Sequence, residues 1–367
     1  MLLVNTARDT LLKPLQVVSG IVERRHTLPI LANILLRKQG NEVSFLSTDV
    51  EIQIQTSAEF GAGNEDAATT VAARKLLDIL RALPEGEVAL SLAGKKLTIQ
   101  SGKSRFNLQT MTADEFPTVA QPERYDIQFN LTQKSLKHLF GMVHFAMAQQ
   151  DIRYYLNGLL FVVDGQQVRA VATDGHRLAF CSTEIEQNLG KQDVIIPRKT
   201  IMELQRLLAD SDEPVKIDIA PNQIRFTFAE IELVSKLVEG KFPDYQRVIP
   251  QNHQKKFVVS RELLLHSLQR VAILTSDKFK GVRWVLSDGA LKLSSTNADQ
   301  EDAHEELEVA YSGDSLDIGF NVSYLLDVLN NLKVDQVQVA LQDQNSSALI
   351  TLPEQENFKY VVMPMRI

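Results

Sequence analysis

The chain contains a single cysteine, Cys181, among its 367 residues, so it cannot form an internal disulfide and offers no cysteine cluster for zinc. This scarcity is typical of proteins that fold in a reducing compartment. Long apolar runs are also missing. Asp9 and Lys13 interrupt the N-terminal stretch before a signal-peptide core could form, and no run of 18 apolar residues occurs. We therefore expect a protein that is neither exported nor membrane-spanning.

The common catalytic signatures are absent as well: GxxxxGK[ST], GxGxxG, HExxH, GxSxG and CxxC do not occur. One enzymatic candidate is 173-TDGHRLAFC-181, in which His176 could activate Cys181 as a nucleophile near Asp174. The competing interpretation is an ordinary Asp174-Gly175 turn followed by a strand that buries an inert thiol. The seven histidines are scattered without metal-ligand spacing, so no metal site and no cofactor is predicted.

A positive net charge is also lacking. The chain has 39 Lys and Arg and 46 Asp and Glu, which gives a formal net charge of −7. This balance argues against a grossly basic nucleic-acid binder. The 44% apolar and 23% charged residues are typical of globular proteins, and the length allows two or three domains.

What the chain does contain is one pattern repeated three times with a period of about 120 residues, the size of a small domain. Each copy runs from an amphipathic helix to a hairpin, a second helix and further strands. The first helices are expected at 10–25, 133–147 and 261–274, with Asn130 or Thr132 capping the second and Ser260 the third. The hairpins are expected at 34–49, 158–174 and 282–297, the second helices at 74–83, 198–208 and 323–332, and the later strands at 88–101, 215–228 and 337–352. We infer three α+β domains over 1–125, 126–253 and 254–367, joined by polar linkers.

The basic residues are concentrated on the expected helices. Counted over 10–25, 74–81, 133–147, 198–208, 261–274 and 323–332, they carry 13 Lys and Arg and 5 Asp and Glu, which leaves −15 for the rest of the chain. If the helices share a surface, that surface attracts a polyanion. Lys and Arg are also good helix formers on solvated faces, but Glu is equally good and is scarce here. Because no recognition motif is present, we expect weak, salt-sensitive contacts to the phosphate backbone.

The C-terminus, 360-YVVMPMRI-367, is apolar and has no acidic residue. Val361 and Val362 could complete a core strand, but Pro364 lacks a backbone donor and fits a regular strand poorly. Exposed Met363 and Met365 would suit an adaptable surface for several peptides.

Several segments together resemble the bacterial DNA polymerase III β-subunit family of sliding clamps. They are 12-LKPLQVVSG-20, 102-GKSRF-106, 151-DIRYYLNG-158, 173-TDGHRL-178, 235-SKLVEGKFPDY-245, 319-GFNVSYLLDVL-329 and 360-YVVMPMRI-367. The resemblance, which runs essentially end to end, implies three clamp domains per chain, with antiparallel sheets outside and helices inside. Two chains would then pair head to tail into a closed six-domain ring around duplex DNA.

The function that this resemblance implies is a processivity factor without catalysis of its own, in the cytoplasm at the nucleoid. The implied partners are a second copy of the chain, double-stranded DNA without sequence specificity, the clamp loader and the polymerase III α subunit. Other DNA polymerases and repair proteins would bind through short Leu-Phe-like peptides, and no membrane is involved. An enzyme and a sequence-specific DNA-binding regulator are the alternatives, and the missing motifs disfavour both.

The resemblance also implies three sets of site residues. DNA contacts carry over to Arg25, Arg74, Gln150, Tyr154, Tyr155 and Arg198, with Arg24 as the rival of Arg25. The partner-peptide pocket carries over to Leu156, Thr173, Gly175, His176, Arg177, Leu178, Pro243, Arg247, Val248, Ser347, Val361, Val362, Met363, Pro364, Met365 and Arg366. The dimer interface carries over to Lys75, Lys103, Arg105, Phe106, Leu108, Ile273, Leu274, Glu301 and Glu305. The chain departs from the family pattern in ending in Ile367, where leucine is usual, and in having Trp284 at an aromatic position of the third domain.

Overall fold

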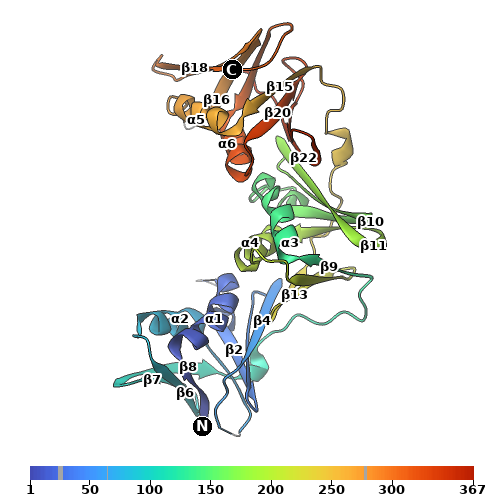
Figure 1. Ribbon diagram of the computed structural model, residues 1–367. Coiled ribbons are helices and arrows are strands. Elements are labelled where there is room, and N and C mark those ends of the chain that lie inside the picture. The colour runs from blue at the N-terminus through green and yellow to red at the C-terminus, as the bar shows by residue number, and fades with distance from the viewer. Residues whose placement is uncertain (24–27, 64, 277–278) are drawn as a thin grey trace. The chain divides into compact units, whose positions relative to one another are not determined.

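The computed structural model describes residues 1–23, 28–63, 65–276 and 279–367, and it divides into two compact units (Figure 1). Unit 1 comprises Met1–Leu136 with Met202–Leu237, and unit 2 comprises Lys137–Ile201 with Val238–Ile367. Within the described part of the chain, no helix is both long and apolar enough to cross a membrane.

Unit 1 contains one antiparallel sheet to which the first and second sequence repeats both contribute strands. Its spatial order is β1 (Leu2–Ala7), β6 (Glu87–Ala93), β7 (Lys96–Ser101), β8 (Ser104–Met111), β5 (Ala67–Ala72), β2 (Asn33–Gln39), β3 (Glu42–Thr48), β4 (Ile52–Glu59), β14 (Ile231–Lys236), β13 (Gln223–Phe228), β12 (Pro214–Ile219) and β9 (Ile127–Thr132). The repeats are joined by β4 and β14, which pair from Ile52↔Ser235 to Thr56↔Ile231.

Unit 2 contains two antiparallel sheets. The six-stranded sheet has the order β10 (Gly158–Thr173), β11 (Arg177–Pro197), β22 (Gln355–Val362), β21 (Ala348–Leu352), β20 (Gln336–Leu341) and β15 (Lys255–Ser260). The four-stranded sheet has the order β18 (Asp302–Glu308), β17 (Ala290–Thr296), β16 (Gly281–Ser287) and β19 (Leu316–Asn321). The second and third repeats are joined by β11 and β22, so each unit is built around sheets that continue from one repeat into the next.

All six expected helices are confirmed within the described residues. They are α1 (Arg8–Val18), α2 (Ala73–Ala82), α3 (Gln133–Gly141), α4 (Arg198–Leu207), α5 (Arg261–Ala272) and α6 (Val322–Asn331). Short 3-10 turns occur at Ser19–Ile21, Pro29–Ala32, Ala113–Glu115, His144–Ala146, Tyr154–Leu156 and Tyr245–Arg247. Of the two expected caps, Ser260 Oγ accepts from the Leu263 amide at 3.4 Å. Thr132 Oγ1 accepts from the Ser135 amide at 3.1 Å, whereas Asn130 lies within β9.

Three expected boundaries were wrong. The helix expected over 10–25 is α-helical only as far as Val18, and a 3-10 turn follows at Ser19–Ile21. The helix expected over 133–147 ends at Gly141, where glycine is a poor helix former and the Val143 amide turns to the carbonyl of Phe140 at 3.2 Å. The turn expected at 164-DGQQ-167 does not end a strand. It lies inside β10, where Gly165 has φ +63° and the register with β11 shifts. The first and third hairpins are confirmed, with Gly40 and Gly289 at positive φ in their turns.

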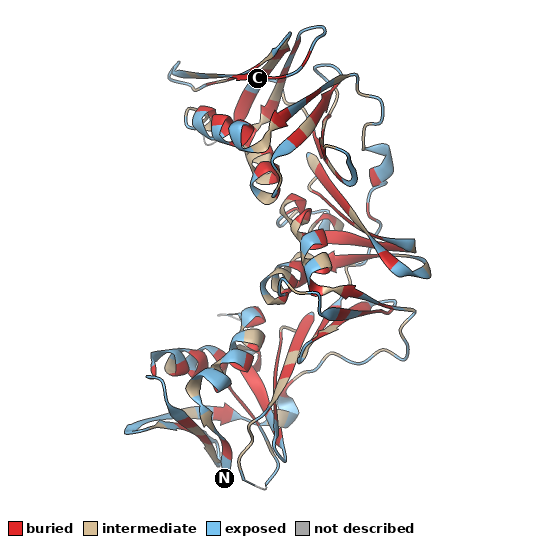
Figure 2. Cartoon of the chain, viewed as in Figure 1, coloured by how far each residue is buried: buried red, intermediate tan, exposed pale blue. Residues whose placement is uncertain are grey.

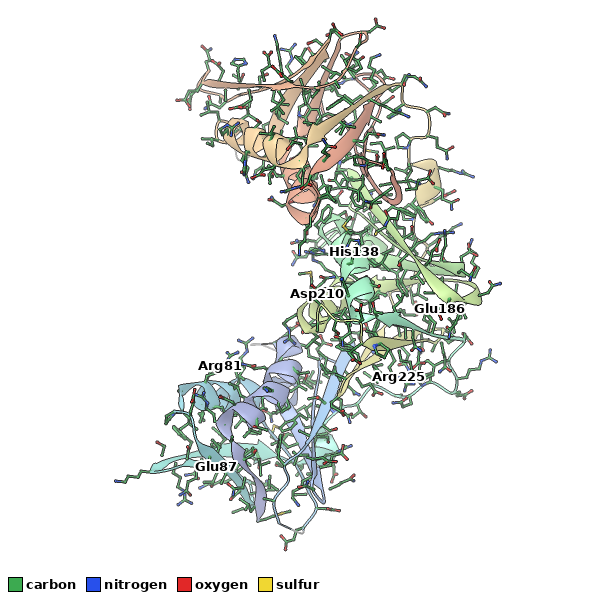
Figure 3. All side chains as sticks on the ribbon, viewed as in Figure 1. Arg81, Glu87, His138, Glu186, Asp210 and Arg225 are labelled. Carbon is green, nitrogen blue, oxygen red and sulfur yellow. The ribbon has the colours of Figure 1, made fainter. Side chains whose placement is uncertain are left out.

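The core lies between the sheets and the apolar faces of the helices, where Figure 2 shows the buried residues gathered. In unit 1, α1 and α2 pack against each other (Figure 1), and α2 buries Leu76, Leu77 and Leu80 while Arg81 extends away (Figure 3). In unit 2, α5 packs against α6, and Trp284 is buried edge-on to Phe320 with ring centres 5.3 Å apart.

The polar connection before the second repeat is attached to the sheet of unit 1 by Arg225 of β13, which is labelled in Figure 3. Its guanidinium lies 4.4 Å from the centre of the Tyr125 ring and donates to the buried carboxylate of Asp218 at 2.7 Å. Burial raises the pKa of Tyr125 above its ordinary value, although the charge of Arg225 opposes this. A polar linker in sequence is therefore held in place by a cation stacked on an aromatic ring.

Gly158, the first residue of β10, has no room for a side chain. A Cβ there would lie 2.7 Å from the carbonyl oxygen of Ile196 and 2.8 Å from Cγ2 of Ile195. We expect Gly158→Ala to lower the free energy of unfolding by roughly 1–3 kcal/mol, because backbone must move. Gly190→Ala is the matched control on β11, since nothing lies within 4 Å of its Cβ position. Equal urea midpoints for the two variants would contradict this account.

Candidate partner pocket and nucleic-acid surface

The segment 173-TDGHRL-178 forms a tight turn between β10 and β11 in unit 2. Asp174 Oδ1 accepts from the amides of His176 at 2.9 Å and Arg177 at 3.1 Å. Thr173 Oγ1 donates to the Arg177 carbonyl at 2.6 Å and accepts from the Gly175 amide at 3.1 Å. Gly175 has φ +91°, which disfavours a side chain at this position. The Thr-Asp-Gly sequence is thus explained by the turn it builds.

Arg177 emerges from this turn with its guanidinium group largely buried. It donates to Asp174 Oδ2 at 3.1 Å and to the Phe145 carbonyl at 2.8 Å, both in the second repeat. It also donates to Asp327 Oδ2 of α6 at 2.5 Å, and its Cζ lies 4.5 Å from the centre of the Tyr324 ring. Burial alone would lower the pKa of Arg177, but Tyr360 and the Asp327 and Asp174 carboxylates raise it above its usual value. The cation therefore ties the second repeat to the third.

His176 and the C-terminal segment meet at the same place. The imidazole stacks on Tyr324 with ring centres 6.4 Å apart, and the His176 carbonyl accepts from the Met363 amide at 2.9 Å. β22 ends at Val362, and the Met365 amide then donates to the Gly319 carbonyl at 2.8 Å. The expectation that Val361 and Val362 lie in a strand and that Met363–Met365 do not is confirmed, and the Met363 side chain is 47% exposed.

The apolar residues of the predicted pocket come together beside this turn. Leu156, Leu178 and Val361 belong to one buried cluster with Phe242 and Tyr245. The connecting segment that supplies Tyr245 also carries Pro243, Arg247 and Val248, whose side chains are exposed. Two further predicted pocket residues lie outside this cluster. The Ser347 carbonyl lies 2.6 Å from His253 Nε2, and Arg366 is exposed. Val362 pairs with Arg177 across β11 and β22, which brings both into the same neighbourhood.

Cys181 does not resemble a nucleophile. It is fully buried within β11, where it pairs with Ala170 on one side and Phe358 on the other. Burial raises the pKa of its thiol to about 12, which leaves almost no thiolate at neutral pH. The hydrolase interpretation of 173-TDGHRLAFC-181 is therefore disfavoured by the chemistry of its own nucleophile.

Two residues that touch this site were missed by the sequence analysis, Tyr324 and Asp327. Both lie on α6, three residues apart, and therefore on one face of that helix. The segment that carries them, 323-SYLLDVLNNL-332, predicts a helix by its apolar pattern, and that pattern does not mark either residue. A polar and an aromatic side chain at helical spacing could have marked the face that meets Arg177.

Four of the predicted DNA-contact residues lie in one region of unit 2. Gln150 is exposed at φ +55°, and Tyr154 and Tyr155 lie edge-on with ring centres 6.0 Å apart. The loop that carries them is joined to the start of α4, because the Arg198 amide donates to the Asn157 carbonyl at 3.0 Å and Arg198 Nη1 to that of Met147 at 3.4 Å. Burial, followed by the charge of Arg177, lowers the pKa of Arg198.

The loop 151-DIRYYLNG-158 is held by Asp151. Its amide donates to Asn157 Oδ1 at 2.9 Å, and its carboxylate accepts from the Arg153 side chain at 2.9 Å. The hydrogen bonds from Arg153 lower the pKa of Asp151 to about 2. Arg153 also donates to the Asp174 carbonyl at 3.2 Å, so the two strongest sequence motifs of the second repeat are in direct contact.

One further predicted DNA contact, Arg74, is in unit 1. Arg74 lies in the first turn of α2, where its Nη2 donates to the Val22 carbonyl at 3.2 Å. Arg25, with its rival Arg24, lies outside the described residues.

Most of the predicted interface residues fall on two open sheet edges and at the end of α5, whereas Lys75 lies in the first turn of α2. β8 carries Phe106 and Leu108 and pairs with β7, while its other edge meets β5 only at residues 110 and 111. Among the described residues β18 pairs only with β17, which leaves its second edge open. Lys75, Lys103, Arg105 and Phe106 are exposed.

On the side of β18, Ile273 caps the C-terminal end of α5 with 76% of its surface exposed, and Leu274 is half-buried. Glu305 is held within its own chain, since it accepts from Arg270 at 2.7 Å, and this lowers the pKa of Glu305. Glu301 accepts from the Asn297 side chain at 2.6 Å.

Comparisons with known proteins cover the whole chain. The family models of the DNA polymerase III β subunit match in order, with the N-terminal domain at residues 2–120, the central domain at 130–244 and the C-terminal domain at 246–366. The chain is 46% identical over 362 residues to the β sliding clamp of Pseudomonas aeruginosa and 46% identical over 361 residues to that of Escherichia coli K12, each time over 98% of both chains.

Solved structures agree with these matches. A crystal structure of the DNA polymerase III β subunit from Pseudomonas aeruginosa aligns with a TM-score of 0.95 at 45% identity over 100% of both chains. The β sliding clamp of C. crescentus aligns with a TM-score of 0.93 at 37% identity, again over 100% of both chains. With its three tandem clamp domains and antiparallel sheets, the chain belongs to the bacterial DNA polymerase III β-subunit family, the sliding clamps, which are non-catalytic accessory subunits of that polymerase.

Proposed function

We propose that two copies of this chain join head to tail into a closed ring around duplex DNA, at the nucleoid in the cytoplasm, and tether the polymerase III α subunit. A clamp loader opens the ring with ATP that the loader hydrolyses. Other DNA polymerases and repair proteins bind the ring through short Leu-Phe-like peptides. The observation that carries the proposal is that two strands each leave an edge open among the described residues: β8 in the first repeat, which meets β5 only at residues 110 and 111, and β18 in the third.

The proposed clamp domains are 1–125, 126–253 and 254–367. The family matches at 2–120, 130–244 and 246–366 support three domains with a first boundary between 120 and 130, although the C-terminal match begins at 246, eight residues before the proposed 254. The recurrence of strand, helix and hairpin in each domain supports the same division into three. The two compact units follow a different division because β4–β14 and β11–β22 pair across the proposed boundaries.

The ring proposal rests on how open edges behave. An edge strand with unpaired backbone groups is a template for another chain, and proteins that remain monomeric usually block such edges. Here β8 of one copy would meet β18 of the other, with Phe106 and Leu108 against Ile273 and Leu274. A head-to-tail contact between different surfaces closes into a ring when the rotation allows it. Exposed ion pairs contribute about 0–1 kcal/mol each, so the apolar contact dominates.

We expect Ile273→Ala combined with Leu274→Ala to give a folded monomer. Burying such a side chain contributes roughly 1.5–3 kcal/mol, and a two-chain ring contains each contact twice. Sedimentation velocity measures the species. The control is Leu263→Ala on the same helix, since Leu263 is 59% exposed but lies at the other end of α5. An intact dimer in the double variant would contradict the interface.

The proposed DNA contacts are few and are directed at phosphates. The helices carry the excess of basic charge in an otherwise acidic chain, and the part of the chain that the structure describes shows no recognition helix beyond the six clamp helices. Such contacts neutralise a few phosphates and carry no sequence information, so binding is salt-dependent and mobile. Retention on DNA then depends on the closed ring.

We expect the ring to stay on nicked circular DNA and to slide off once the circle is linearised. Replacing Arg25, Arg74 and Arg198 by Glu should impair loading and flatten the salt dependence by up to about one in the log–log slope per phosphate contact. Gel filtration of loaded complexes measures both effects. The control replaces Arg124, Lys191 and Lys292 by Glu. It changes the net charge by the same amount, but at a connecting segment and two strands in place of the proposed contacts. Unchanged loading by the first variant would reject these contacts.

The proposed peptide pocket combines fixed apolar walls with an adaptable rim. Leu156, Leu178 and Val361 are buried in one cluster, and a ligand site needs such walls with a few polar groups to fix direction. His176 and Arg177 supply polar groups that Tyr324 and Asp327 hold in place. Met363 is exposed, flexible and polarizable, so it can repack around different side chains.

We expect Met363→Glu to weaken binding of a fluorescent Leu-Phe peptide by about tenfold or more, because a carboxylate would be desolvated in an apolar site. Fluorescence anisotropy measures the affinity. This substitution is sharper than deleting residues 363–367, which would also remove the Met365–Gly319 hydrogen bond and the Ile367 side chain that lies 3.3 Å from the Cβ position of Gly281. Met202→Glu on α4 is the control, with an equally exposed methionine at 42%. Undiminished affinity for Met363→Glu would reject the pocket.

A further inference from the structure

Unit 2 contains a cavity of about 760 Å³ that none of the predicted site residues lines. Its floor is the face of the six-stranded sheet at Phe180, Leu349, Thr351 and Lys359, and its wall is the connecting segment at Tyr245 and Ile249. The volume falls in the range of roughly 300–1,000 Å³ that is usual for ligand pockets. Phe180 and Tyr245 stack with ring centres 5.9 Å apart, so the wall is fastened to the floor.

The register of the sheet makes this cavity the neighbour of the proposed peptide pocket. Leu178 pairs with Val361 across β11 and β22, and Phe180 pairs with Lys359. On the next strand, Leu349 pairs with Val361 and Thr351 with Lys359. Residues two apart in a strand lie on the same face, about 6.6 Å from each other. The apolar row of the pocket and the floor of the cavity are therefore successive rows of one surface.

Leu156, Leu178, Val361, Phe180 and Tyr245 also belong to a single buried cluster, against which Ile249 and Leu349 are packed. The connecting segment that carries Val248 toward the pocket carries Tyr245 and Ile249 into the cavity wall. The pocket and the cavity therefore adjoin one packed cluster and one connecting segment.

The lining of the cavity favours an uncharged ligand. Its two cations, Arg169 and Lys359, are balanced by two carboxylates, Glu354 and Glu356. Lys359 Nζ lies 5.5 Å from the centre of the Phe180 ring, so its alkyl stem covers the aromatic floor. The remaining polar lining consists largely of four glutamines, which can donate to and accept from a peptide backbone; they are Gln246, Gln251, Gln338 and Gln355.

The balanced charge and the glutamines of the lining favour a peptide over a nucleic acid as the ligand of the cavity. A lining without net charge does not attract a nucleic-acid backbone. Glutamine amides beside aliphatic and aromatic groups match an extended peptide that presents one apolar side chain and free backbone groups. Continuity with the pocket supplies such a peptide already tethered at one end, which raises its effective concentration at the cavity.

We propose that the cavity is a second docking site for the same partner peptides, holding the uncharged segment next to their Leu-Phe end and anchoring one aliphatic or aromatic side chain on Leu349 and Lys359. This inference rests on the proposed peptide pocket and extends it. Partners with the same Leu-Phe end then differ in affinity through the residues that adjoin it.

Three labelled peptides test the proposal by fluorescence anisotropy. The first carries only the Leu-Phe end. The second extends it by about six uncharged residues, one of them leucine, on the N-terminal side, and the third does so on the C-terminal side. Such an extension spans about 20 Å when fully extended. We expect one extended peptide to bind the wild-type protein about tenfold tighter than the short one. Thr351→Arg, and independently Gln338→Arg on the adjacent strand, should remove that gain and leave the short peptide's affinity unchanged.

Thr227→Arg is the matched control, because Thr227 is a half-buried threonine of β13 outside both sites, and it should retain the gain. Equal affinities of all three peptides for the wild type, or a gain that survives both Arg variants, would overturn this inference alone. Failure of every peptide to bind would overturn the proposed pocket and this extension with it.

Discussion

The pairing of β11 with β22 is the interaction on which the candidate pocket depends. Five residue pairs, from Arg177↔Val362 to Cys181↔Phe358, align a strand of the second repeat with one of the third. A slip of one residue would turn every side chain to the opposite face. It would separate Leu178 from Val361 and turn Cys181, in place of Phe180, toward the connecting segment that packs on this face. The ladder therefore sets both which apolar rows face the connecting segment and where Arg177 emerges beside α6.

Arg177 adds ion pairs and hydrogen bonds between the second and third repeats to this backbone alignment. A guanidinium with 9% of its side chain exposed is tolerated because the Asp174 and Asp327 carboxylates, the Phe145 carbonyl and the Tyr324 ring surround it. Removing one partner of such a buried pair leaves a charge without compensation, which costs far more than a surface pair contributes. The geometry of the pocket rim is thus coupled to the contact between repeats. A ligand that contacts His176 or Tyr324 therefore contacts groups whose positions depend on Arg177 and its partners.

The sequence predicted most of this fold because its signals are local. Helical periodicity located all six helices, and the turn glycines Gly40 and Gly289 located two hairpins. Errors arose where a local signal was weak or misleading: Gly141 ends a helix whose apolar pattern continues, and Gly165 interrupts a strand without ending it. Tyr324 and Asp327 escaped notice because their role comes from a partner some 150 positions away, as the Arg177–Asp327 hydrogen bond shows. The lined cavity beside the pocket likewise depends on strand register, which no single segment encodes.

The two kinds of binding proposed for this chain, to DNA and to partner peptides, differ in the charge that they need. DNA attraction needs positive potential, and the expected helices carry the basic excess while the rest of the chain is acidic. The proposed pocket instead has its charges balanced, since Arg177 pairs with two carboxylates, and the adjoining cavity balances two cations with two carboxylates. A peptide site without net field does not compete for phosphates and loses little affinity as salt screens the DNA contacts. The proposed peptide binding and the proposed DNA contacts can therefore respond to different forces on the same molecule.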